Sequence, residues 1–157
     1  MTEVTPSVAM SADFTDYLAR HADHMRRLDE CRPGNIAALF DALAASGITA
    51  VVVTFDGYGD SGQIESIDAS DTQGEVALPA GEIAVASPGD GEAIEHTAVS
   101  LHDAIEDLAY DLLRDTHAGW ENNDGAYGVF TFDVAARTIS LDHNERYTAI
   151  ESYSHEW

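Results

Sequence analysis

The segment ITAVVVTFD at 48–56 limits the possible folds more than any other part of the sequence. It is rich in β-branched residues and its middle is apolar on both faces, which is typical of a central strand. The glycines of GYGDSG follow it, and QIESID at 63–68 then favours a return strand after a wide loop. The sequence therefore predicts a sheet built around residues 48–56.

Two helices are expected before this strand. Apolar residues recur at helical spacing over 11–30, with Ser11 as the N-cap, and RPG at 32–34 predicts the end of that helix. Asn35 then caps a second helix, and Gly47 supplies the left-handed residue after its end.

A third helix and further strands are expected after it. Ser100 begins a capping-box pattern with Asp103, and an apolar stripe continues to a helix end near His117. Residues 69–97 are interpreted as a surface excursion with strand-like pieces at 75–78 and 82–86. From Gly125 the hydrophobic period changes to two residues, which predicts a meander of three strands. Its last strand is expected over 145–153, after a DHN turn. Its apolar face is expected to be buried under the helices through Phe130, Phe132, Ile139 and Leu141.

These elements predict an α+β fold: a mainly antiparallel sheet of about five strands with two to three helices on one face. A length of 157 residues with 45% hydrophobic composition suits one core. We expect residues 1–32 to form an N-terminal tail and helix, and residues 33–157 to form a single domain.

The charge is strongly acidic. Asp and Glu number 29 against seven arginines and no lysine, and the formal net charge is −22. Binding to phosphates requires cations, so direct contact with nucleic acid or with an anionic membrane is excluded, and a basic protein is the expected partner. The single Cys31, together with the lack of a membrane-length apolar run or a signal segment, favours a cytoplasmic protein.

Three blocks of the sequence resemble those of a known family: VTFDGYGDSGQIE, AIEDLAYDLL and GWENNDGAYGVFTFDVAARTISLDHNERY. The chain is similar over roughly 35–150 to a family of uncharacterised bacterial and mobile-element proteins, one catalogued as a domain of unknown function. The resemblance implies a shared fold and a plasmid or phage setting. It implies no activity for any residue.

The third helix carries a row of acids that is a candidate partner-binding surface. Its members recur at i, i+4 with one further acid beside them: Asp103, Asp107, Asp111, Asp115 and Glu106. Four helical residues rise about 6 Å, close to the phosphate spacing along one nucleic-acid strand. The row therefore suits either a DNA mimic that inhibits a host restriction or CRISPR enzyme, or a merely solvated helix face.

Two acidic loops offer a second candidate site. If they meet at one end of the sheet, their carboxylates supply the oxygen ligands that Ca²⁺ or Mg²⁺ prefers. The ligands of this expected metal site are Asp56, Asp60, Glu65, Glu121 and Asp124. Turn chemistry is the competing explanation of the second loop, in which Asn122, Asn123 and Gly125 shape the backbone and Trp120 and Tyr127 pack it against the sheet.

No histidine spacing resembles a zinc signature, and no nucleophile with an identifiable triad is visible. We therefore expect a non-enzymatic, acidic protein-binding domain for a basic, nucleic-acid-handling protein. The alternatives are a divalent-metal-binding domain, with or without hydrolytic activity, and a general interaction module whose acidity reflects a salty habitat.

Overall fold

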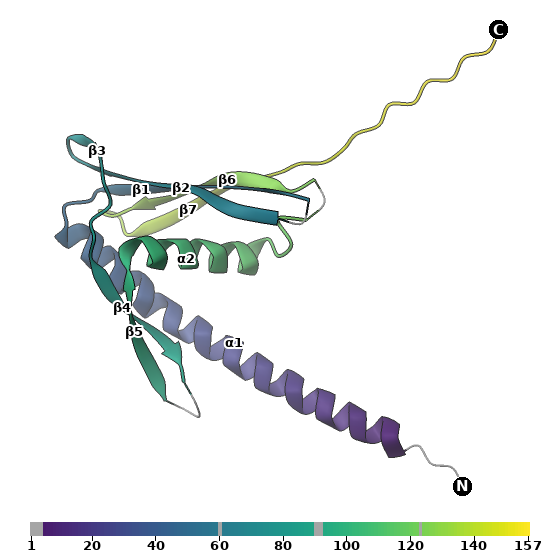
Figure 1. Cartoon of the computed structure of the whole chain (residues 1–157), viewed down its shortest axis with the longest axis horizontal. Helices are drawn as coiled ribbons and strands as arrows, with labels where there is room; N and C mark the ends of the chain where they lie inside the picture. The colour runs from purple at the N-terminus through teal and green to yellow at the C-terminus, as the bar shows by residue number, and fades with distance from the viewer. Residues whose placement is uncertain (1–4, 60, 90–92, 123) are drawn as a thin grey trace.

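A five-stranded antiparallel sheet, with helices on one of its faces, forms the body of the molecule (Figure 1). This computed structural model describes residues 5–59, 61–89, 93–122 and 124–157, with side chains described from residue 12 onward. The strands follow the order β3-β2-β1-β6-β7, and a second, two-stranded sheet pairs β4 with β5. The elements are α1 (Thr5–Ala45), β1 (Ala50–Tyr58), β2 (Ser61–Asp71), β3 (Gly74–Val76), β4 (Glu82–Pro88), β5 (Ile94–Ser100), α2 (Leu101–Thr116), β6 (Ala126–Asp133) and β7 (Thr138–Glu145). The predicted α+β class is confirmed.

The central strand is β1, as its composition predicts. It pairs with β2 on one side and with β6 on the other, both antiparallel. Side chains alternate along it, so Val51, Val53 and Phe55 are fully buried against the helices. From the neighbouring strand, Phe130 and Phe132 are buried on the same face, and Ile139 and Leu141 are partly buried beside them, as expected.

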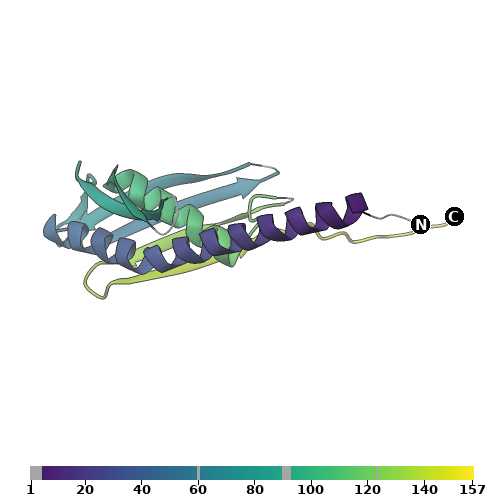
Figure 2. The same ribbon diagram turned by 90° about the horizontal axis from the view of Figure 1, so that it is seen from below.

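The helices cover only this face. Phe40 of α1 packs against Phe132 with ring centroids 6.1 Å apart, and Ile105 and Leu113 of α2 are fully buried in the same core. Figure 2 shows α1 running along the molecule and extending beyond the sheet at its N-terminal end. No helix of the described chain lies over the other face in Figure 1, and polar side chains such as Thr54 and Thr131 are half-buried there.

The prediction of two separate N-terminal helices is wrong, because α1 is continuous from Thr5 through Pro33. An interior proline removes one helix hydrogen bond and costs about 3 kcal/mol. Met25 and Leu28 before the proline and Leu39 after it line one crevice beside β4 and α2. Packing on both sides of Pro33 therefore holds the two segments in one helix, and the expected division between residues 32 and 33 falls inside α1.

Asn35, the expected N-cap, joins α1 to β4 instead. Its Nδ2 donates to the carbonyl of Ala86 at 2.9 Å, and its Oδ1 accepts from the N–H of Ala86 at 2.8 Å. This two-way amide contact anchors the β4–β5 hairpin, of which the sequence predicted only the first strand.

The predicted strand over 145–153 is also wrong. Strand β7 continues through 142–144, where a turn was expected, and pairs with β6 up to Glu145 opposite Ala126. No strand pairs with residues 146–157 in the described chain, and Tyr147, Ile150 and Tyr153 are exposed there. The expected three-strand meander is therefore a two-strand hairpin.

The helix α2 is predicted correctly. Ser100 is its N-cap, and the Oγ of Ser100 accepts from the N–H of Asp103 at 3.1 Å. Neither helix of the described chain combines the length and apolar character that a membrane span requires.

Candidate functional site

The first acids of the α2 row lie opposite the helix face that packs on the sheet. Asp103 and Asp107 are exposed, whereas Ile105 and Ala109 on the other side are buried. Asp103 lies in the first turn, where its negative charge complements the helix dipole. The amphipathic pattern of the helix thus directs these carboxylates to solvent.

Two members of the row are neutralised by arginines. Arg114 Nη2 lies 3.0 Å from Asp111 Oδ1, and Arg32 Nη1 of α1 lies 2.6 Å from Asp115 Oδ2. No arginine forms an ion pair with Asp103, Glu106 or Asp107 among the residues that the structure describes. The negative charge of the row therefore has no arginine counter-ion in its N-terminal half.

The pKa of Asp107 reflects this arrangement. Partial burial raises the pKa of its carboxyl first, and the negative charges of Asp103, Asp111 and Glu106 raise it further. The group is largely exposed, so solvent screens the repulsion. The contribution of the three neighbouring carboxylates to this shift reflects the negative charge gathered on this part of α2.

A crevice runs beside the row, between α1, β4 and α2. Its volume is about 180 Å³. Leu28, Leu39 and Ile83 give it an apolar floor, and Asp29, Arg32, Asp107 and Asp111 are among the charged residues that line it. The acidic surface is therefore hollowed and apolar inside, rather than flat.

The two acidic loops do meet, through Trp120. Its ring lies edge-on to Phe55 at 5.4 Å and covers Gly57 and Gly62, where a Cβ atom would approach the indole to 2.7 Å and 2.6 Å. Trp120 thus packs the loop against the sheet end, as the turn interpretation expects. Tyr127 does not, because it lies on the uncovered sheet face with Arg146 stacked 4.7 Å above its ring.

The backbone of this loop follows its glycines. Gly119 and Gly125 have positive φ of 78° and 80°. The N–H of Asn122 donates to Gly119, and the N–H of Gly125 donates to the carbonyl of Asn122. Asn123 lies outside the described residues.

The carboxylates of the two loops have separate partners. Asp56 forms an ion pair with Arg146 at 2.9 Å, although the angle is not that of a hydrogen bond, and Asp124 accepts from Thr148 at 2.7 Å. Glu65 accepts from Gln63 at 3.2 Å, and Glu121 lies over Gly62. Asp60 lies outside the described residues.

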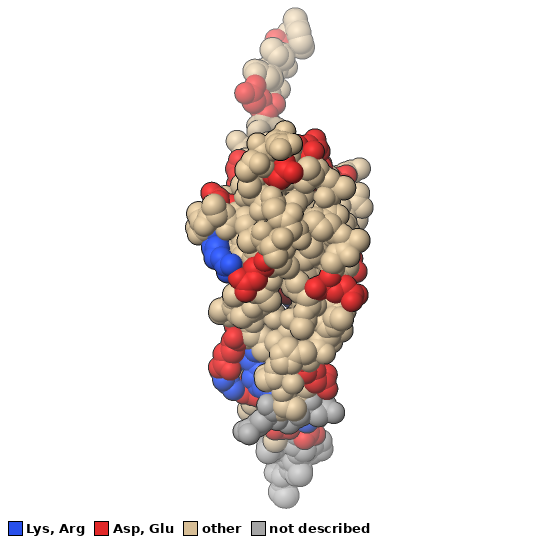
Figure 3. Space-filling view, turned by 90° about the vertical axis from the view of Figure 1, so that its left-hand side faces the viewer, with Lys and Arg blue, Asp and Glu red and all other residues tan. Residues whose placement is uncertain are grey.

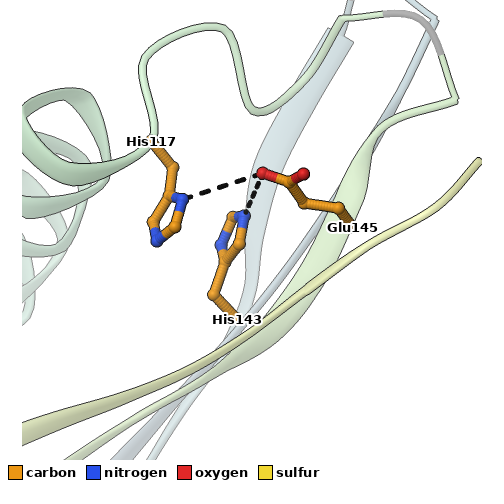
Figure 4. Close-up of side chains that lie close together, drawn as sticks. All are labelled: His117, His143 and Glu145. Atoms are coloured by element: carbon orange, nitrogen blue, oxygen red, sulfur yellow. Dashed lines mark ion pairs between the residues drawn. The ribbon is translucent and has the colours of Figure 1, made fainter.

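A different group of ligand-type side chains comes together nearby. His117, His143 and Glu145 place one donor atom each within 4.8 Å of one another, and they are the only such group of three in the described chain (Figure 4). His117 is the C-cap of α2, and the other two point from β7 toward the helices. Sequence reasoning treated these histidines as scattered. The signal that it missed is the alternation Ile139, Leu141, His143, Glu145, which continues through the segment interpreted as a turn.

Comparison with protein families gives one match, to a family of unknown function, DUF6878, over residues 31–157. Comparison with curated proteins and with solved structures gives no match. The matched region begins inside α1 and includes the whole sheet, α2, the Trp120 loop and the histidine pair. Because this match covers most of the chain, the protein belongs to the DUF6878 family of unknown function.

Proposed function

We propose that the protein is an acidic binding domain for a basic, nucleic-acid-handling protein. The observation that carries the proposal is that every arginine is already engaged within the chain. Six form ion pairs with carboxylates of this chain: Arg20, Arg26, Arg32, Arg114, Arg137 and Arg146. The seventh, Arg27, donates to the carbonyl of Ala93 at 3.1 Å.

With seven arginines engaged and 29 acids in the sequence, most of the negative charge has no internal counter-ion. In the face shown in Figure 3, the basic side chains lie beside acidic ones, and other acidic side chains stand apart from any base. A surface of this kind attracts a basic partner over long distances and repels nucleic acid.

The N-terminal half of α2 is the centre of the proposed surface. Asp103 and Asp107 lie one helical turn apart without an arginine, beside a crevice with an apolar floor. Such a surface can bind a basic side chain through its carboxylates and the alkyl part of that side chain through the crevice.

The more specific proposal is DNA mimicry. The acids of α2 follow a spacing of about 6 Å, similar to that of backbone phosphates. Because Arg114 and Arg32 hold Asp111 and Asp115, a partner would compete with these arginines for the second half of the row. A host restriction or CRISPR enzyme is the class of partner that a mobile element would inhibit in this way.

The test compares two double variants with equal change in charge. Asp103→Asn/Asp107→Asn neutralises the proposed surface, and Asp68→Asn/Asp142→Asn neutralises two exposed acids of the sheet face that the helices do not cover. Binding to basic DNA-processing enzymes is measured at two salt concentrations, with duplex DNA as competitor.

The α2 variant should bind at least about tenfold more weakly, the difference should shrink at high salt, and DNA should displace the parent protein. Equal losses in both variants would indicate that only net charge matters, as for a protein adapted to a salty habitat. Binding that DNA leaves unchanged would exclude mimicry and leave a general interaction module.

A further inference from the structure

The histidine pair between α2 and β7 is built by the sheet register. Phe55 lies opposite Gly128, and Gly128 lies opposite His143, so no side chain separates the two rings across the ladder. The rings of Phe55 and His143 stack with centroids 5.8 Å apart. Above them, His117 stacks on His143 with centroids 3.6 Å apart and planes within 9°.

The imidazole of His143 is a buried polar group without a hydrogen-bond partner. Its side chain is 7% exposed, and neither ring nitrogen makes a hydrogen bond. The nearest acceptor, Oε1 of Glu145, is 3.6 Å from Nε2, beyond a good hydrogen bond. Leaving a buried polar group unsatisfied destabilises a protein, so a ligand that satisfies this nitrogen would stabilise the fold.

Burial lowers the pKa of His143, and the neighbouring His117 lowers it further, against the opposing effect of Glu145. The direction of this shift favours the neutral imidazole, which is the form that binds metal ions. Oε1 of Glu145 lies 3.8 Å from Nδ1 of His117 as well, so one carboxylate oxygen lies near both rings (Figure 4).

We propose that His117, His143 and Glu145 form a three-ligand Zn²⁺ site. Two imidazoles and one carboxylate are a known donor set for zinc, with metal–ligand distances of about 2.0–2.2 Å. Tetrahedral geometry then requires about 3.3 Å between donor atoms. Oε1 of Glu145 lies 3.6 Å from Nε2 of His143 and 3.8 Å from Nδ1 of His117, and both separations are close to this value.

Binding requires a rotation of one ring. A coordinating lone pair lies in the plane of its imidazole, so two parallel rings cannot point at the same ion. His143 is held by Phe55, but His117 is 35% exposed and lies at the open end of α2. The ring of His117 therefore turns out of the stack and directs Nδ1 toward the ion.

The fourth position of the proposed site is open. A cavity of about 320 Å³ adjoins it. Among its lining residues are His117, Trp120, Asn122, Asp124, Glu145 and Arg146. Zinc sites with three protein ligands and an open position bind water or substrate there.

Isothermal titration with Zn²⁺ on chelator-treated protein tests the proposal. The parent should bind one ion per chain with a Kd in the micromolar range or below, and excess Mg²⁺ should not displace it, because imidazole ligands favour zinc. His117→Ala and Glu145→Gln should each weaken binding at least about tenfold, since even the outer-shell partners of a metal site contribute that much. Both side chains are at least one third exposed, so the variants should fold, and circular dichroism verifies this.

The control is His102→Ala, because His102 Nδ1 lies 3.3 Å from Oδ1 of Asp103, an exposed histidine–carboxylate pair without a third ligand. This variant should bind zinc as the parent does. Co²⁺ gives a second readout, since its visible absorption bands should report a tetrahedral N/O site in the parent and disappear in His117→Ala. Equal zinc affinity in the parent and His117→Ala, or an equal loss in His102→Ala, would overturn the site.

Discussion

Gly125 is the residue at which local backbone geometry decides whether the candidate site can form. Its φ is +80°, and a Cβ atom there would lie 1.7 Å from the carbonyl oxygen of Gly57. The loop that carries Trp120 can therefore approach β1 only if residue 125 has no side chain. Gly125 also lines the cavity that adjoins the proposed zinc site, so this close approach shapes that cavity.

We predict that Gly125→Ala destabilises the protein by at least about 3 kcal/mol, because backbone strain and a steric clash add together. Gly47→Ala is the matched control: its φ is +78°, but a Cβ atom there meets nothing within 4 Å, so only about 1–2 kcal/mol of strain is expected. Urea unfolding measures both. If the two variants lost the same stability, the close contact with Gly57 would be refuted.

At the scale of elements, the sequence predicts best what is encoded locally. The N-cap Ser100, the β-branched composition of β1 and the turn glycines Gly119 and Gly125 all act within a few residues, and the cap, the central strand and the turns were each predicted correctly. The continuity of α1 through Pro33 depends instead on β4 and α2, which lie far away in the sequence.

The same distinction between local and long-range determinants explains which parts of the two candidate sites could be predicted. The acids of α2 could be predicted from their spacing, but the pairing of Asp115 with Arg32 could not, since Arg32 belongs to another helix. His117 and His143 come together only through the β6–β7 register, which the expected turn at 142–144 would have interrupted.

The helix α2 provides a prediction with a defined pH dependence. The pKa of Asp107 is raised in the folded state, so the folded protein binds that proton more tightly than the unfolded chain does. The corresponding stability is present below the unfolded pKa and is lost as pH rises through the folded pKa.

Asp107→Asn should therefore be more stable than the parent at pH 7, by about 0.5 kcal/mol for two relieved i, i+4 pairs. The advantage should shrink as pH falls through the raised pKa of this carboxyl, because the parent side chain then becomes protonated. Denaturant unfolding at pH 7 and pH 3 measures both effects. An advantage that grew on acidification would show that the charge of Asp107 stabilises the helix.

At the scale of the whole molecule, the region matched by the family and the N-terminal part of α1 that extends from it differ in burial. The family match starts at residue 31, and α1 extends N-terminally from there as an exposed helix with Phe14 and Tyr17 on its surface. The matched part contains the core, the acidic row of α2 and the proposed zinc ligands, whereas Met25 and Leu28, which precede it, line one side of the crevice.

The net charge of −22 leads to a prediction about ionic strength. The ion pairs of the six paired arginines are mostly exposed, and such pairs contribute about 0–1 kcal/mol each, so salt removes little stability by weakening them. The repulsion among the remaining carboxylates acts over the whole surface, and salt screens it over a Debye length of about 10 Å at 0.1 M.

Raising NaCl from 10 mM to 500 mM should therefore increase the melting temperature by several degrees, since about 1 kcal/mol corresponds to about 4 °C in a domain of this size. Calorimetry on chelator-treated protein separates this effect from zinc binding, and a Zn²⁺-induced increase should add to it in the parent but not in His117→Ala. A melting temperature that fell with NaCl would show that attractive ion pairs outweigh the repulsion. The acidic surface would then be compensated internally, and the basis for proposing a basic partner would be lost.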